Sequence, residues 1–411
     1  MAGEIGVHVP GGRLIMLKHS LRRSLRFCLA GSAVLAATAA FAQSQPPIKI
    51  GFMVTLSGPL AIVGQEQYDG FMQAVEERGG KLGGVPVEIL KEDDQFKPEV
   101  ATQIVTKLIT RDHVPIISGI SGSNVAMAVA KSITDKGVFL VSTNAGPSPL
   151  AGASCSPNLF VASWQNDMQS ESMGKYASDK GYKRVVALAP NYQAGKDYVS
   201  GFKRYYNGKV VNEIYTPVNQ LDFSAELTQI ASDKPDAIFA FYPGALGISF
   251  VRQYRLAGLD KTIPILSAGI LEIPAVTALK DSALGALGGT FWSPDVDNPT
   301  NKQFVEKFES KHNRIPSTWA AQGYDGALLL DSAIAKVKGN VADKDAFRAA
   351  LKAADFKSVR GKFKFNNNHF PIQDMRVVEA VKDDKGRYTV RTVATPLKDH
   401  QDAFHGQCPM S

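Results

Sequence analysis

The chain has 411 residues, of which 44% are hydrophobic and 21% charged, as is typical of a globular protein with room for two domains. The formal net charge is +7, but the first 42 residues carry +4 of it and the remainder only +3. This balance does not indicate a partner such as nucleic acid. After residue 42 no run reaches the ~18 consecutive apolar residues that span a bilayer, so a membrane-spanning protein is excluded.

The first 42 residues have the pattern of a Sec-type signal peptide. Basic residues lie between Lys18 and Arg26, an apolar run begins near Phe27, and Ala40-Phe41-Ala42 provides a small-residue cleavage site. We expect residues 1–42 to be removed on export to the periplasm, with either Met1 or Met16 as the true start. Cys28 lacks the preceding small residues of a lipid-modified cysteine, so a soluble exported protein is expected.

Strand and helix patterns alternate through the first half of the remaining chain. The apolar runs predict strands at 48–54, 85–94, 113–120 and 137–145. Between them, helices are predicted at 64–80, 98–112 and from about Ser123 onward.

The same alternation resumes after residue 165. It predicts helices at 169–181, 195–208, 222–234 and 244–258, and strands at 182–190, 209–217, 235–243 and 263–269. Two successive runs of this kind indicate an α/β protein with two doubly wound parallel-sheet lobes, each with helices on both faces.

Small-residue loops follow the predicted strands, at the edge where such sheets bind ligands. They are 55–61, 118–124, 142–149, 189–195, 241–247 and 266–272. The helix near Ser123 begins with unpaired backbone N–H groups beside the hydroxyls of Ser121 and Ser123, which suits a small anion. Simple capping by Ser123 or Asn124 is the alternative for this stretch alone. Two lobes that present their strand ends to each other favour a ligand cleft.

Signals for catalysis, metals and nucleotides are weak. The string "GISGS" lacks the spacing of a nucleophile elbow, and no catalytic triad can be assembled. The histidines after residue 42 are scattered, and His400, His405 and Cys408 form only a weak metal-ligand pattern. The phosphate-binding loops of nucleotide-binding proteins are absent from the sequence. We therefore expect no enzyme, no cofactor and no metal.

Two cysteines remain after the signal peptide. Cys155 and Cys408 would lie in an oxidising compartment, where we expect them to form a disulfide that ties the tail to the middle of the chain. Two unpaired thiols are the alternative.

Four stretches together resemble the branched-chain-amino-acid-type periplasmic binding proteins, which deliver ligands to ABC importers. They are "IKIGFMVTLSGPLAIVGQEQYDGFMQAV", "GGKLGGVPVEILKEDDQFKPEVATQIVTKLI", "QGYDGALLLDSAI" and "VRGKFKFNNNHFPIQD". The resemblance implies two lobes joined by a three-strand hinge, with the ligand trapped between them. It implies an N-terminal lobe of residues 43–162 and 289–363, and a C-terminal lobe and tail of 163–288 and 364–411.

The resemblance also implies which residues bind the ligand. The family holds a ligand carboxylate with a serine at the helix start, here Ser123 beside Ser121, and with the loop Thr143, Asn144, Ala145 and Gly146. Aromatic residues at the crossover and the second-lobe strand ends could stack on a flat ligand, although packing in the hinge or core is the alternative for Trp164 and Phe241. The remaining expected contacts are Tyr192, Tyr242, Gly269 and Ile270.

Departures from the family pattern concern ligand specificity. Amino-acid binders carry Ala-x-Thr where this chain has Asn144 and Gly146. They also carry an acid that binds the ligand ammonium, where this chain has Ser-Ala-Gly at 267–269. Burying an ammonium without a partner costs several kcal/mol, so an α-amino acid is disfavoured unless Glu272 reaches the ligand. Val63 and Ala194 make the expected pocket roomier and more apolar.

"SWQND" and "SVRGKFKFNNNHFPIQD" are similar to the family branch that binds aromatic carboxylates such as benzoate or phenylpropenoates. The expected partners are therefore an aromatic acid and the permease subunits of an ABC importer, and the expected state is a monomer. A binder of branched-chain amino acids or short amides, supported by an acid such as Glu272 or Asp325, is the first alternative. A ligand-sensing domain and an exported enzyme are the others.

Overall fold

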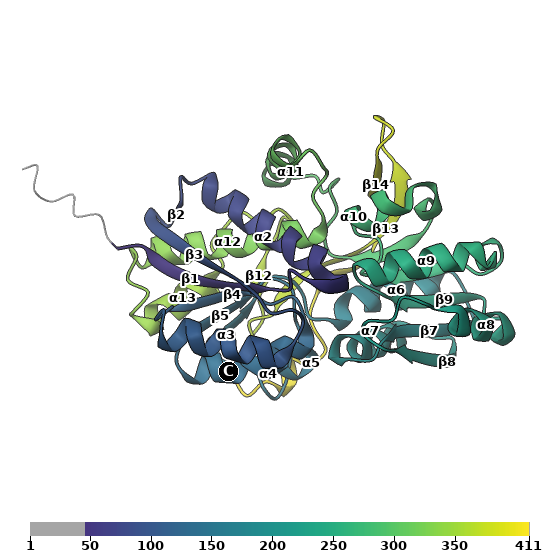
Figure 1. Ribbon diagram of the computed structural model, residues 1–411, viewed down its shortest axis with the longest axis horizontal. Coiled ribbons are helices and arrows are strands. Elements are labelled where there is room, and N and C mark those ends of the chain that lie inside the picture. The colour runs from purple at the N-terminus through teal and green to yellow at the C-terminus, as the bar shows by residue number, and fades with distance from the viewer. Residues whose placement is uncertain (1–45, 411) are drawn as a thin grey trace, which may run out of the picture. The chain divides into compact units, whose positions relative to one another are not determined.

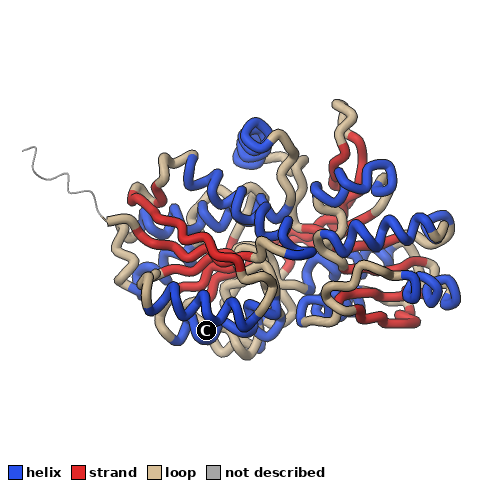
Figure 2. The backbone as a smooth tube through the Cα atoms, in the orientation of Figure 1, coloured by secondary structure: helices blue, strands red, loops and turns tan. Residues whose placement is uncertain are grey.

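Residues 46–410 are described by the computed structural model, so the expected signal peptide lies outside the described residues. From Pro47 onward the chain forms one compact unit. Its strands make two sheets, and each sheet with its helices forms one lobe (Figure 1, Figure 2).

The first sheet has six strands in the order β2-β3-β1-β4-β5-β6. All neighbours are parallel except β2, which pairs with β3 in an antiparallel hairpin. Strand β1 is buried at every position but Lys49, because helices cover both faces of the sheet. The strands are β1 (Ile48–Val54), β2 (Lys81–Leu82), β3 (Val85–Asp93), β4 (Ile116–Gly119), β5 (Phe139–Ser142) and β6 (Leu159–Val161).

Two helix pairs sandwich this sheet. Helices α2 (Ala61–Glu76) and α12 (Thr318–Lys336) cover one face, and α3 (Pro98–Thr110) and α4 (Ser123–Asp135) cover the other (Figure 1). A Cβ at Gly70 would lie 1.9 Å from the Ala320 carbonyl oxygen, so α2 and α12 are in backbone contact there. The other elements of this lobe are η1 (Gly58–Leu60), α5 (Ser148–Ala151), α11 (Pro299–His312) and α13 (Lys344–Ala353).

The second sheet has the order β12-β13-β11-β10-β9-β7-β8, with β14 paired to β13. Strands β7 to β11 are parallel as the sequence predicts, but β12, β13 and β14 run antiparallel, which the prediction of a purely parallel sheet did not include. The strands are β7 (Arg184–Pro190), β8 (Lys209–Thr216), β9 (Ala237–Phe241), β10 (Ile265–Ala268), β11 (Leu287–Thr290), β12 (Lys364–Phe365), β13 (Pro371–Lys382) and β14 (Tyr388–His400).

Helices cover both faces of the second sheet as well. On one face α6 (Asp167–Asp179) packs on α7 (Gln193–Tyr205), and their apolar side chains share a core with Phe239. On the other, α8 (Ser224–Asp233), α9 (Ala245–Leu256) and α10 (Ile273–Leu279) form a core around Phe250. The 3-10 turns η2 (Leu259–Lys261), η3 (Lys280–Ala283) and η4 (His405–Gln407) complete the elements. Among the helices of residues 46–410, none has the length and hydropathy of a membrane span.

The chain passes between the sheets after β6, after β11 and before β13. Because β11 pairs with β10 and β13, residues 289 and 290 belong to the second sheet. After β14 the tail returns to the first lobe, where Cys408 forms a disulfide with Cys155 between α5 and β6. The disulfide therefore ties the end of the tail to the first lobe.

Candidate functional site

A narrow cavity lies where loops at the carboxyl ends of strands from both lobes meet. The space that the centre of a water-sized sphere can occupy in it is about 40 Å³, and a single water molecule needs about 10–15 Å³ of such space. Only a small ligand therefore fits. Eight of the residues expected from the sequence line it: Ser121, Ser123, Asn144, Ala145, Trp164, Tyr192, Phe241 and Gly269.

Four other expected residues are placed elsewhere by the structure. Thr143 is fully buried and donates its hydroxyl to Gln67 Oε1 at 2.9 Å. Gly146 packs against the Trp164 backbone, since a Cβ there would lie 2.0 Å from its carbonyl oxygen. Tyr242 and Ile270 belong to the core of the second lobe. These four residues support the loops of the cavity from behind.

Nine lining residues were not in the expected set. The sequence analysis relates three of them to the pocket without placing them in the ligand-binding set: Val63, Ala194 and Glu272. Tyr198 follows Ala194 by one helical turn in α7, so this spacing could have identified it. The remaining five carry no local signal in the sequence: Leu60, Asn166, Gln169, Pro243 and Trp319.

One end of the cavity is rich in hydrogen-bond donors. Helix α4 begins there at Ser123, with Gly122 as its N-cap. The Ser121 hydroxyl oxygen accepts from Thr55 N at 3.1 Å and Gln67 Nε2 at 3.0 Å, and the Ser123 oxygen accepts from Asn166 Nδ2 at 3.0 Å. Both serines therefore keep their own O–H to donate. Together with the positive end of the helix dipole, they make this end suitable for a carboxylate.

Aromatic side chains form much of the cavity wall. They are Trp164, Tyr192, Tyr198, Phe241 and Trp319. Tyr198 stacks on Phe241 with ring centroids 3.7 Å apart, and the Tyr192 ring centroid lies 6.4 Å from that of Phe241. Burial raises the pKa of both tyrosines, so they present neutral hydroxyls. Such walls favour a flat apolar ligand body.

Glu272 is an acidic residue of the cavity wall, a few residues after the end of β10, where positions 267–269 carry no acid. It precedes α10 and lines the cavity, and its Oε2 accepts from Thr318 N, across the lobes, at 2.9 Å. Burial raises the pKa of Glu272 to about 7, and the nearby Glu66 charge adds to the rise. Asp325, the other acid considered, is fully buried and engaged by Arg360 at 3.0 Å, and it lies outside the cavity wall.

Replacing Glu272 with glutamine is expected to stabilise the ligand-free protein at pH 8 by up to about 3 kcal/mol. The raised pKa means that the folded state holds the proton more tightly than the unfolded state. The stability contributed by Glu272 is therefore complete below about pH 4.5 and is lost as the pH rises through about 7. A neutral glutamine avoids that loss and can still accept from Thr318 N.

Urea unfolding at pH 5 and pH 8 measures this effect. The exposed Glu88→Gln variant is the control and should change little at either pH. An equal gain for Glu272→Gln at both pH values would contradict the pKa assigned to Glu272.

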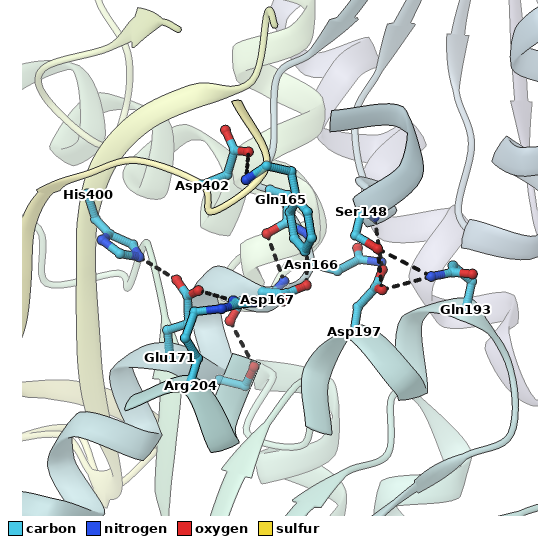
Figure 3. A network of polar contacts seen from close by, with 12 residues as sticks. Ser148, Gln165, Asn166, Asp167, Glu171, Gln193, Asp197, Arg204, His400 and Asp402 are labelled. Carbon is cyan, nitrogen blue, oxygen red and sulfur yellow. Dashed lines mark hydrogen bonds and ion pairs between the residues drawn. The ribbon is translucent and has the colours of Figure 1, made fainter. Parts of the chain in front are cut away.

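A polar network beside the cavity connects the lobes (Figure 3). Asn166 donates to Ser123 Oγ and, at 2.9 Å, to Asp197 Oδ2, while Asp197 also accepts from the backbone and hydroxyl of Ser148 in the first lobe. The Ser123 hydroxyl is therefore held by contacts that cross between the lobes.

The same network continues along α6 toward the tail. Arg204 forms ion pairs with Asp167 and Glu171, and the His400 ring contacts Glu171 from the end of β14 (Figure 3). Burial, with the Asp197 charge as a second cause, raises the pKa of Asp167 to about 7. These side chains hold the start of α6 next to the crossover that carries Trp164.

The chain is similar to known proteins both in sequence and in structure. Residues 47–386 match the family described as "Periplasmic binding protein". A Brucella melitensis protein named Leu/Ile/Val-binding protein homolog 6 is 29% identical over 388 residues, covering 91% of this chain and 97% of that protein.

Two solved structures of R. palustris ABC-transporter solute-binding proteins are also similar. One, in complex with benzoate, is 32% identical with a TM-score of 0.83, covering 88% of this chain and 99% of that one. The other, in complex with 4-hydroxybenzoate, is 28% identical with a TM-score of 0.81, covering 87% and 99%.

Proposed function

Because this chain belongs to the periplasmic binding protein family, whose members bind substrates and are not enzymes, we propose that it captures a small aromatic carboxylate between its lobes for an ABC importer. The serine donors at the start of α4 would hold the carboxylate. The aromatic walls would hold the ring.

The observation that carries this proposal is the pairing of those two features in one narrow cavity. Ser121 and Ser123 each retain a free O–H at one end, and Phe241, Tyr192 and Tyr198 line the wall. A single ring with a carboxylate satisfies both, and the benzoate complexes of related proteins support the same choice.

An aliphatic amino acid is the second candidate, because Glu272 lines the cavity and could neutralise an ammonium. The names of the sequence relatives also favour it. Against it, Glu272 is already bonded to Thr318 N and has its pKa raised to about 7, so only about half of its carboxyl groups are ionised at neutral pH. We therefore rank the aromatic acid first.

A thermal-shift titration of ligand-stripped protein tests the proposal. A ligand at a hundred times its dissociation constant adds about 2.7 kcal/mol to the stability of the folded state. We expect benzoate-type acids to raise the melting temperature and leucine and valine to leave it unchanged. Ser123→Ala should weaken benzoate binding by about 1.5–3 kcal/mol, since it removes a hydrogen bond to a charged group.

The matched control for that variant is Ser132→Ala, on the same helix but away from the cavity, which should bind benzoate as the wild type does. A melting temperature that responds to leucine and not to aromatic acids would replace our choice of ligand with the amino acid.

The proposal includes export and partners. The family implies a periplasmic protein, and we propose that residues 1–42 act as the signal peptide that sends it there. We further propose a monomer that docks with the permease subunits of the importer.

A further inference from the structure

A second set of polar side chains in the cavity wall comes from the crossover and the second lobe. It includes Trp164, Gln169, Tyr198 and Glu272. The serines of the carboxylate end come from the first lobe instead. The two sets therefore belong to different lobes, and a ligand with polar groups at both ends would link them.

One donor in this set has no partner. Trp164 is only 5% exposed, and its Nε1–H has no hydrogen-bond acceptor among residues 46–410. Burial raises the pKa of Tyr198, and the contact of its hydroxyl with the Trp164 N–H lowers it slightly, but that contact does not satisfy the geometry of a full hydrogen bond. An unpaired buried N–H is costly, so its presence in a cavity wall points to a ligand oxygen.

The neighbouring groups leave room for a ligand hydroxyl to donate as well. The Tyr198 hydroxyl gives its proton to Gln169 Oε1 at 3.0 Å, so its oxygen can only accept. Glu272 receives one bond at Oε2 from Thr318 N, and a carboxyl group has lone pairs for more. A ligand hydroxyl can accept from the free Trp164 N–H and donate its own proton to one of these acceptors.

We propose that these side chains recognise a hydroxyl group on the aromatic ring, so that the preferred ligands are hydroxylated aromatic acids. The Trp164 Nε1–H donates to the hydroxyl oxygen, and the hydroxyl donates to Glu272. This inference rests on the proposed function, because it assumes that an aromatic acid occupies the site.

Calorimetric titration with benzoate, 4-hydroxybenzoate, 3-hydroxybenzoate and 4-methylbenzoate tests it. We expect a hydroxylated acid to bind the wild type at least about 10-fold more tightly than 4-methylbenzoate, which has a similar size but cannot form either bond. Trp164→Phe removes the donor and should reduce that ratio to about 3-fold or less, whatever its effect on overall affinity. Ser123→Ala removes a donor to the carboxylate, which all four acids share, so it should weaken all four acids and keep the wild-type ratio.

Two results overturn the inference while leaving the proposed function in place. One is tight binding of benzoate or 4-methylbenzoate with no advantage for either hydroxylated acid. The other is a Trp164→Phe protein that folds, as its melting curve shows, and keeps the full preference. If Trp164→Phe does not fold, Glu272→Gln gives the same test. The glutamine oxygen accepts from Thr318 N and its amide N–H replaces the oxygen that accepts from the ligand hydroxyl, so the ratio should fall. Failure of every aromatic acid to bind would overturn the inference together with the proposed function.

Discussion

Replacing Arg360 with methionine is expected to lower the free energy of unfolding by about 3–5 kcal/mol, because it leaves a buried carboxylate without its cation. Arg360 is 6% exposed and pairs through Nε with Asp325 Oδ2 at 3.0 Å. Its Nη1 and Nη2 groups donate to the carbonyls of Ser163 and Ala162 at 2.8 and 2.7 Å. The guanidinium therefore ties α12 to the first crossover between the lobes.

Urea unfolding with the exposed Arg391→Met variant as a control measures this cost, and the control should change stability by less than about 0.5 kcal/mol. Combining Arg360→Met with Asp325→Leu should recover part of the loss, since no buried charge is then left unpaired. A loss below about 1 kcal/mol for Arg360→Met alone would contradict the stabilising role of the Arg360–Asp325 pair.

Removing the disulfide with Cys155→Ser and Cys408→Ser together is expected to cost about 2–5 kcal/mol. The bridge joins positions 253 residues apart in sequence, so it closes a very long loop in the unfolded chain. Loop-closure entropy grows with loop length, although for long loops the measured gain falls short of the theory.

A reductant separates this effect from the loss of side-chain packing. It should lower the melting temperature of the wild type and leave that of the double serine variant unchanged. Two titratable thiols in unfolded, unreduced protein would contradict the pairing of Cys155 with Cys408.

The parallel strands could be predicted from the sequence because each is buried on both faces. Strands β1 and β7 are buried at all but one position, and such runs are visible as continuous apolar segments. The long antiparallel hairpin of β13 and β14 was missed because its strands are only partly covered. Buried and half-buried residues alternate along β13, and most of β14 is half-buried or exposed, so no continuous apolar run marks either strand.

The candidate site divides in the same way. Ser121 and Ser123 could be found because they follow a strand and begin a helix, a local pattern with a known consequence for anions. Gln169 and Trp319 lie inside helices, and which face of a helix meets the cavity depends on how the lobes pack. Glu272 could not be placed in the site from the sequence, because Thr318, which donates to it, lies 46 residues further along the chain.

The bridge between Cys155 and Cys408 also affects the order of events as the protein matures. Cys408 follows the last strand of both sheets, whereas Cys155 precedes the second sheet altogether. A chain that emerges N-terminus first therefore exposes Cys155 while its partner is still to come. The native bridge can therefore form only after nearly the whole chain has emerged.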